Sequence, residues 1–231
     1  MANKNWHRIW NSKSLTSSGH VDLAELLLLN GWDTKLTEAV HAVFMDYAQE
    51  MGAWVGLRDG QSLLEAGCGS GALLYALNSL WRLQLSGVDY SASLIEVARK
   101  ALPDGDFVCE RLGNMPPDPK CDVIVVNSVF QYLDKQEAES ALSRMLSRAD
   151  VVAVLDVPDA ETQSGAEALR MEALDPIQYA KLYRGLDHTY YARDWFRQQA
   201  ARKNFECEFR NSFIPGLRQN AFRFSCLIGK Q

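Results

Sequence analysis

The sequence predicts an α/β fold with a mostly parallel sheet, helices on both of its faces and an antiparallel C-terminal strand. Strand-like apolar runs alternate with segments of helical periodicity over most of the 231 residues. A glycine-rich turn at 67–71 joins one such strand to one such helix. Near the end of the chain, segments 205–210 and 221–228 alternate apolar and polar residues, with Pro215–Gly216 between them. They predict a hairpin whose last strand is reversed.

Segment 63–74, LLEAGCGSGALL, supplies the first strand, turn and helix of this pattern. Glycine at every second position from Gly67 to Gly71 allows a sharp turn and lets a ligand lie directly against the backbone. The start of the following helix offers N–H groups to a carboxylate or a phosphate. The turn therefore predicts a site for a nucleotide-like ligand.

Two classes of ligand fit this turn. Gly67, Gly69 and Ala72 satisfy the G-x-G-x-x-A form of the dinucleotide fingerprint. Glu65 followed by G-x-G-x-G instead matches the loop that binds S-adenosylmethionine. Asp89 ends the second predicted strand and is compatible with both ligands, because a carboxylate there accepts hydrogen bonds from two ribose hydroxyls.

The elements that follow fit a parallel sheet with crossover helices. Residues 91–102 have one apolar face and predict a helix, and 106–109 predict the third strand. The continuous apolar run at 121–126 is typical of a strand buried on both faces. A fifth strand is expected at 151–157 and a later helix at 193–203.

The glycine turn with its preceding acid, Asp89 and the C-terminal hairpin resemble the class I S-adenosylmethionine-dependent methyltransferases of the small-molecule type over roughly residues 55–228. The hairpin decides against a nicotinamide dehydrogenase. The resemblance implies a Rossmann-like sheet of seven strands, S-adenosylmethionine as cofactor and S-adenosylhomocysteine as product. It also implies a set of cofactor-binding residues, which are Glu65, Gly67, Cys68, Gly69, Gly71, Asp89, Tyr90, Arg111, Leu112 and Asn127.

Recognition of the adenine edge leaves two alternatives. The resembled family places an acid about five residues before a proline, but the residue at that distance from Pro116 is Arg111. Either backbone groups around Arg111, Leu112 and Gly113 bind the adenine, or Glu110 does.

Several polar and aromatic residues are expected around the rest of the ligand. Tyr90 would pack on the adenine, and Asn127 would lie near the methionine part because it ends the fourth strand. Trp10, Tyr132 and Asp156 are the expected contacts to the second substrate.

We expect one domain in which two segments close over the site. Residues 1–54 form an N-terminal helical lid, with helices at 22–29 and 36–51, and residues 55–231 form the core. The core carries a lid insertion at 158–191, which is long for a connection between a strand and a helix.

Three residues at the end of this insertion are the catalytic candidates: His188, Tyr190 and Tyr191. Methyl transfer chiefly requires a lone pair held in line with the S–CH₃ bond. A hydroxyl would also need a base, for which histidine has a suitable pKa, whereas an amine would need only to be kept neutral and oriented. We expect His188 to be that base or that orienting group, with Tyr190 or Tyr191 assisting through its phenol. The alternative is that 187–189 caps a helix and that its histidine contacts the backbone.

Composition limits the partners. The net charge of −5 argues against a nucleic-acid substrate. Asn127 is also not followed by the Pro-Pro-aromatic motif of the enzymes that methylate exocyclic nitrogens of bases.

The apolar run at 26–29 is too short to span a membrane and follows no leader peptide, so we expect a cytoplasmic location. The five cysteines lack zinc spacing and are expected to be reduced. Asp156 and Asp159 lack a third ligand, so no metal is predicted.

The sequence thus predicts methyl transfer from S-adenosylmethionine to an oxygen, in preference to a nitrogen, of a small polar metabolite. A natural-product intermediate or a sugar-like molecule would fit. The alternatives are an RNA or protein methyltransferase, or a regulatory protein that binds the cofactor without catalysis. Monomer and homodimer remain equally open.

Overall fold

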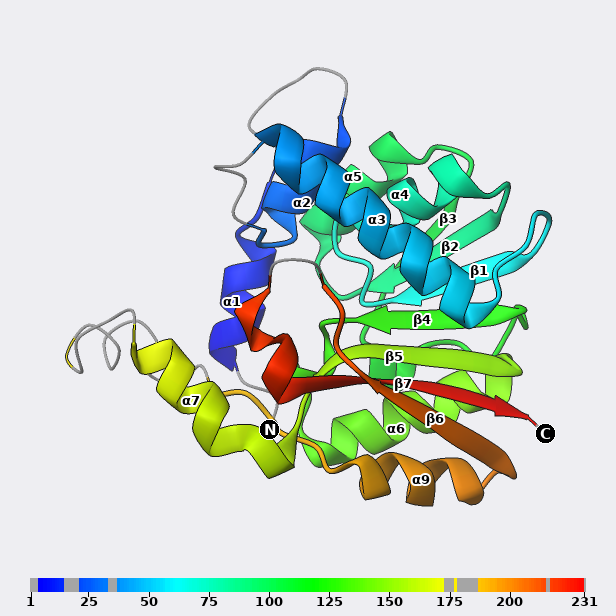
Figure 1. Ribbon diagram of the computed structural model, residues 1–231. Helices are drawn as coiled ribbons and strands as arrows, with labels where there is room; N and C mark the ends of the chain where they lie inside the picture. Colours follow the sequence, from blue (N-terminus) through cyan, green and yellow to red (C-terminus); the bar gives the residue numbers. More distant parts are fainter. Residues whose placement is uncertain are drawn as a thin grey trace.

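A computed structural model describes residues 4–14, 21–32, 37–172, 177, 187–214 and 217–230. Within this part of the chain, one sheet contains seven strands in the order β3-β2-β1-β4-β5-β7-β6 (Figure 1). The strands are β1 (Ser62–Ala66), β2 (Gln84–Asp89), β3 (Asp106–Cys109), β4 (Val123–Asn127), β5 (Val151–Pro158), β6 (Phe205–Asn211) and β7 (Arg223–Lys230).

Strand direction confirms the predicted sheet. Strands β1 to β5 pair in parallel, and β7 pairs antiparallel with both β5 and β6. Six strands therefore share one direction and the C-terminal strand is reversed.

Helices cover both faces of the sheet (Figure 1). On one face, α2, α3, α4 and α5 share an apolar core with Val123 and Val125 of β4, whereas α6 and α9 share the core of the other face with Ile124 and Val126. Alternate residues of the central strand thus enter two different cores, as a doubly covered strand requires. The helices are α1 (Lys4–Asn11), α2 (Leu23–Leu29), α3 (Thr37–Val55), α4 (Ala72–Leu80), α5 (Ala92–Ala101), α6 (Lys135–Arg148), α7 (Gln163–Met171) and α9 (Arg193–Ala201).

Side-chain caps set the start of several helices. Asp22 accepts a hydrogen bond from the Glu25 N–H at the start of α2, and Ser91 accepts one from the Leu94 N–H at the start of α5. Both helices begin one residue later than predicted because the capping residue itself is outside the helix. The predicted helix at 36–51 is longer in the structure and continues to Val55.

The N-terminal helices lie partly over the ends of the strands. Figure 1 shows α1 beyond the end of the sheet to which the arrow of β4 points. Helices α2 and α3 belong to the same apolar core as α4 and α5, so they are built into the domain. Among the described residues, no helix combines the length and the apolar composition needed to cross a membrane.

Two predicted features involve residues that the structure does not describe. Pro215–Gly216, predicted between the last two strands, lies outside the described residues. Of the lid insertion, the structure describes α7 and the residues around His188, but not 173–176 or 178–186.

Candidate functional site

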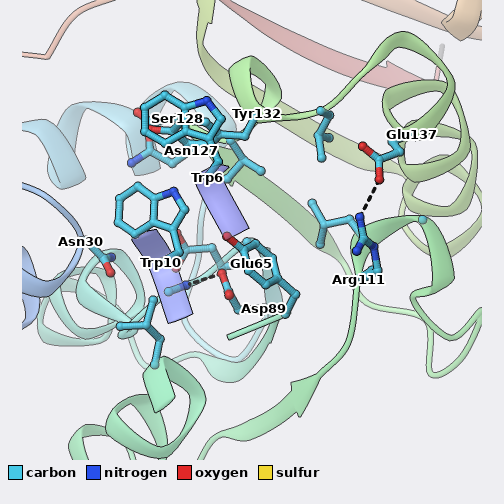
Figure 2. A pocket seen from close by; sticks show the side chains of 18 of the residues that line it. Trp6, Trp10, Asn30, Glu65, Asp89, Arg111, Asn127, Ser128, Tyr132 and Glu137 are labelled. Atoms are coloured by element: carbon cyan, nitrogen blue, oxygen red, sulfur yellow. Dashed lines mark hydrogen bonds and ion pairs between the residues drawn. The ribbon is translucent and has the colours of Figure 1, made fainter. Parts of the chain in front are cut away.

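A cavity of about 350 Å³ lies where the parallel strands end at their carboxyl termini (Figure 2). This is within the usual range of small-molecule sites, and it is the edge at which open α/β sheets place ligands. Its walls come from the glycine turn, the ends of β2 and β4, helix α6 and the N-terminal helices. The main lining residues are Trp6, Trp10, Asn30, Trp32, Phe44, Glu65, Gly67, Gly69, Asp89, Tyr90, Arg111, Leu112, Gly113, Asn127, Ser128, Val129, Tyr132 and Glu137.

The glycine turn forms the floor of the cavity, and its backbone leaves no room for side chains. Gly67 has φ +81°, and a Cβ there would lie 2.5 Å from a methyl carbon of Val129. Gly69 has φ +55°, and its Cβ would lie 2.4 Å from Asn30 Oδ1. Glycine is therefore required at both positions for two reasons, the left-handed backbone and the close approach of a neighbour.

Asn30 holds the end of α2 against this turn. Its Oδ1 accepts a hydrogen bond of 2.9 Å from the Ser70 N–H and lies 2.9 Å from Ser70 Oγ. Ser70 Oγ also lies 2.8 Å from the carbonyl oxygen of Leu26. These contacts join the end of α2 to the glycine turn, and Asn30 itself lines the cavity.

Asp89 lies at the end of β2 and links the turn to α5. Its two carboxylate oxygens accept hydrogen bonds from the N–H groups of Gly69 (3.0 Å) and Ser91 (2.8 Å). Each oxygen keeps a further lone pair that can accept a ligand hydroxyl. Burial raises the pKa of Asp89, and the backbone N–H groups oppose that shift.

Glu65 and Trp10 leave buried polar atoms unsatisfied at this cavity. Within the described residues, Glu65 Oε2 and Trp10 Nε1 have no hydrogen-bond partner. Burial, and then the charge of Asp89, raises the pKa of Glu65 well above its ordinary value. An unpaired buried carboxyl is costly, and a cationic ligand group beside it would compensate that cost.

The far side of the cavity is built by residues 110–114 and α6. Arg111 forms a 2.8 Å ion pair with Glu137 of α6 (Figure 2). Glu110 accepts a hydrogen bond of 2.8 Å from the Arg111 N–H, and it is Arg111, Leu112 and Gly113 that line the cavity. This placement favours the backbone alternative for the adenine edge.

The end of β4 is held by a buried tyrosine of α3. The Tyr47 hydroxyl donates a 2.8 Å hydrogen bond to Asn127 Oδ1. Burial, and then the charge of Asp156, raises the pKa of Tyr47 well above its ordinary value, so the phenol stays protonated and remains a donor. The next residue, Ser128, has a left-handed backbone with φ +56°.

Asp156 belongs to a buried polar network behind the cavity wall. Its carboxylate accepts hydrogen bonds from Ser128 Oγ (2.6 Å) and Ser212 Oγ (3.0 Å), and pairs with Arg223 at 2.9 Å. The Arg223 guanidinium also donates to Gln131 Oε1. In the described chain Asp156 does not line the cavity, so the expected direct contact to substrate has no support in the geometry.

Four rings lie together near the end of β4, and three of them, Trp6, Trp10 and Tyr132, line the cavity, whereas His188 lies behind them and does not. The Trp6 ring lies 4.7 Å from that of Tyr132 and 5.4 Å from that of His188. Tyr132 lies 5.6 Å from His188 and 5.8 Å from Trp10. The sequence identified Trp10 and Tyr132 at this place, but not Trp6.

The His188 imidazole faces a guanidinium. Arg170 Nη2 lies within hydrogen-bond distance of His188 Nδ1, and a guanidinium can only donate. Nδ1 is therefore the unprotonated nitrogen and Nε2 carries the hydrogen. Burial, and then the charges of Arg170 and Arg223, lowers the pKa of His188 to about 3. This environment opposes the expected role as a base and suits a hydrogen-bond donor.

We expect His188 to make the stability of the protein pH-dependent. Between pH 6.5 and pH 3 the unfolded chain binds a proton at this histidine that the folded protein excludes, so stability falls as the pH is lowered. When the pH is lowered from 7 to 5, wild type should lose on the order of 1 kcal/mol more unfolding free energy than H188Q does. Urea titrations at the two pH values measure this. The exposed His41→Gln is the control, and an equal response of both variants contradicts the assignment.

The two tyrosines predicted as catalytic, Tyr190 and Tyr191, have contacts outside the cavity. Tyr191 is fully buried, and its hydroxyl lies within hydrogen-bond distance of the carbonyl oxygens of Leu133 (3.0 Å) and Phe130 (3.2 Å). The Tyr190 carbonyl accepts a hydrogen bond from Lys135 Nζ. Neither lines the cavity in the described structure, which gives no geometric support to a catalytic role for them.

Most of the expected cofactor residues come together. Glu65, Gly67, Gly69, Asp89, Tyr90, Arg111, Leu112 and Asn127 line the cavity, whereas Cys68 and Gly71 do not. The Cys68 thiol is buried, and a Cβ on Gly87 would lie 2.8 Å from it, so it packs against β2.

Asn30, Trp6, Ser128 and Arg170 were not identified from the sequence. Asn30–Gly31 indicates only a break between helices, and nothing local shows that Asn30 reaches the glycine turn. In the part of the chain that the structure describes, no group of three His, Cys, Asp or Glu side chains could hold a metal ion.

Comparison with known proteins agrees with this architecture. A family model described as "Methyltransferase domain" matches residues 63–149. Trans-aconitate 2-methyltransferase from Escherichia coli O1:K1 is 35% identical over 114 residues, which cover 48% of this chain and 45% of that protein. The corresponding Shigella flexneri protein is 32% identical over 133 residues, covering 57% and 52%. The chain thus matches about half the length of these relatives.

Solved structures show the same fold. Magnesium protoporphyrin IX methyltransferase from Synechocystis PCC 6803, with bound S-adenosylhomocysteine, superposes with a TM-score of 0.62 at 15% identity. The alignment covers 99% of this chain and 94% of that one. A TehB-like methyltransferase from Corynebacterium glutamicum gives 0.55 at 16% identity, covering 99% and 98%.

Proposed function

Because the chain contains a methyltransferase domain of the class I S-adenosylmethionine-dependent family, we propose that it transfers a methyl group from S-adenosylmethionine to an oxygen of a small polar molecule. The observation that carries the proposal is the cavity built by Glu65, Gly67, Gly69 and Asp89. These residues come from the matched domain and meet at the carboxyl edge of the sheet.

The cavity fits this cofactor in shape and in charge. Gly67 and Gly69 line the cavity, and a Cβ at either position would lie within 2.5 Å of Val129 or Asn30. Asp89 has lone pairs for ribose hydroxyls, and Glu65 Oε2 and Trp10 Nε1 are buried polar atoms that lack partners among the described residues. A ligand with hydroxyls and a cationic amino acid part satisfies these groups.

The side chains of this protein would bind and orient the cofactor and the methyl acceptor and keep water away from them. When bound, S-adenosylmethionine provides a methyl group on a sulfonium, which needs no further activation. Glu65, Asp89 and the glycine turn fix the position of the ligand, while Trp6 and Trp10 cover it from α1. Tyr47 holds Asn127 at the end of β4 and thereby shapes the wall toward the methyl acceptor. Orientation of the two reactants is the main contribution to the rate.

A small molecule is a better candidate than a macromolecule. The cavity is covered by aromatic side chains of the N-terminal segment, and the chain carries a net charge of −5, which disfavours a polyanion. An oxygen acceptor agrees with the name of the trans-aconitate relatives, although the chain matches only about half of their length. A cytoplasmic location is part of this proposal.

Ligand binding tests the proposal. Calorimetry should show that S-adenosylhomocysteine binds and that NAD⁺ does not, and acceptor screens with labelled S-adenosylmethionine should give a methylated small molecule. Binding of NAD⁺ in place of S-adenosylhomocysteine would overturn the proposal. Methylation of RNA or protein, with no small molecule methylated, would show that the acceptor is a macromolecule. Binding of S-adenosylhomocysteine without any methyl transfer would support a regulatory protein.

Asp89→Asn should weaken S-adenosylhomocysteine binding by about 10- to 100-fold. An amide loses the charge and one acceptor site, while the N–H groups of Gly69 and Ser91 still face it. Calorimetric Kd values measure the effect. Asp106→Asn, at the exposed start of β3, is the matched control and should leave the Kd unchanged. Equal Kd values for the two variants would contradict the ribose role.

A further inference from the structure

We propose, on the premise of the methyl transfer above, that the indole N–H of Trp10 binds the carboxylate of the cofactor's amino acid part. The sequence predicts this residue as a contact to the methyl acceptor, whereas the structure places it against the segment that holds the glycine turn. Trp10 would thus distinguish the complete cofactor from fragments that lack the amino acid part.

In the described chain, the glycine turn itself has no N–H group left over for a ligand carboxylate. Each N–H from Gly67 to Gly71 is already donated to another group of the protein. In chain order, the acceptors are the Val88 carbonyl oxygen for the first two, the Asp89 carboxylate, Asn30 Oδ1 and the Cys68 carbonyl oxygen. The turn lets a ligand lie close to its backbone, but it cannot itself supply the donors that a carboxylate requires.

Two buried polar atoms at the cavity, one donor and one acceptor, lack partners among the described residues. They are Trp10 Nε1 and Glu65 Oε2. The amino acid part of S-adenosylmethionine carries an ammonium and a carboxylate on one carbon atom, and these two groups are complementary to the two protein atoms. An indole N–H and an ammonium can only donate, so the ammonium belongs to Glu65 and the carboxylate to Trp10.

The Trp10 ring is held beside the glycine turn. A Cβ added to Gly31 would lie 3.2 Å from Cη2 of the indole, so the ring rests directly on this glycine. The preceding residue, Asn30, is the one that accepts the hydrogen bond from the turn. On the other side, the carbonyl oxygen of Trp10 accepts a hydrogen bond of 3.3 Å from Ser91 Oγ at the start of α5. The indole is therefore fixed between α2 and α5, at the wall of the cavity.

This position also suits the amino acid end of the ligand. Figure 2 shows Trp10 and Asn30 on one side of the cavity and Arg111 and Glu137 on the other. The backbone at Arg111 is the favoured contact for the adenine, which is at the opposite end of the cofactor from the amino acid part. A ligand whose adenine lies at Arg111 therefore extends its carboxylate toward Trp10.

A carboxylate at Trp10 would strengthen binding. Without a ligand, the indole N–H is buried and unpaired, which costs free energy. A hydrogen bond to an ionised group is stronger than one between neutral groups. Trp10 should therefore favour ligands that carry the amino acid part and have no such effect on ligands without it.

Calorimetry with two ligands tests this assignment. S-adenosylhomocysteine carries the amino acid part, and methylthioadenosine has the same adenosine and thioether sulfur but lacks it. W10F should raise the Kd for S-adenosylhomocysteine by about 10-fold or more and leave the Kd for methylthioadenosine within about twofold of wild type. W6F is the matched control, since Trp6 also lines the cavity from α1 but its Nε1 donates to the carbonyl oxygen of Asp187. It should change both Kd values by the same factor.

Nuclear magnetic resonance of the wild-type protein gives a second measurement. In protein labelled with nitrogen-15 tryptophan, S-adenosylhomocysteine should move the Trp10 indole proton signal downfield and methylthioadenosine should not. The signal is identified by its absence from W10F or W10Y. An equal loss of affinity for both ligands in W10F, or an equal shift of the signal with both, overturns the assignment. Failure of wild type to bind S-adenosylhomocysteine overturns the proposed function instead.

Discussion

Replacing Gly67 by alanine should lower the affinity for S-adenosylhomocysteine by about 100-fold, equivalent to about 2.7 kcal/mol. Gly67 has φ +81°, a conformation that costs an L-residue about 1–2 kcal/mol. The added methyl group would also lie 2.5 Å from Val129, so either the turn or Val129 must move. Both line the cavity, and either movement changes its floor.

Gly60→Ala separates the two causes. Gly60 has φ +87° and lies in an exposed turn, and a Cβ added there would meet no atom within 4 Å, so its substitution brings backbone strain alone. We expect G60A to lose about 1 kcal/mol of stability and to bind S-adenosylhomocysteine like wild type. Calorimetry on both variants measures the difference. A Kd for G67A within about threefold of the Kd for G60A would show that the turn does not hold the ligand.

Local sequence patterns were sufficient to predict the sheet and the glycine turn that lines the cavity. The strand, glycine and helix sequence around Gly67 predicts both a backbone conformation and a binding site, since only glycine tolerates that φ so close to a ligand. The apolar run ending at Asn127 predicts a central strand, and its residues enter two cores as expected. These features depend on residues that are close together in the chain.

The acceptor side could not be predicted in the same way, because its contacts join distant segments. The sequence predicts His188 as a base, and its burial together with the neighbouring guanidinium of Arg170 reverses that interpretation. Asn30 reaches the glycine turn from a different helix, and Trp6 reaches Tyr132 from the start of the chain. Tyr191 looks catalytic beside His188 but is a core residue whose hydroxyl faces backbone carbonyls.

Asp156 shows how a polar residue at a sheet edge can act without touching a ligand. Its side chain and that of Arg223 are only 5% and 6% exposed, and they form a 2.9 Å ion pair. Asp156 has φ +57° and Ser128 has φ +56°, and their side chains are hydrogen-bonded to each other. The network thus fixes two strained residues, one of which forms part of the cavity wall.

Asp156→Asn should therefore reduce the unfolding free energy by about 3–5 kcal/mol, because it leaves the Arg223 guanidinium buried without a counter-charge. Asp150→Asn, at the residue just before the same strand, breaks the exposed pair with Lys230 and should cost less than about 1 kcal/mol. Urea unfolding of the two variants gives the comparison. The double variant D156N/R223Q should lose clearly less than the sum of its single losses, since removal of both partners leaves no isolated charge. Additive losses, or a D156N as stable as D150N, would show that the pair does not hold this end of the sheet together.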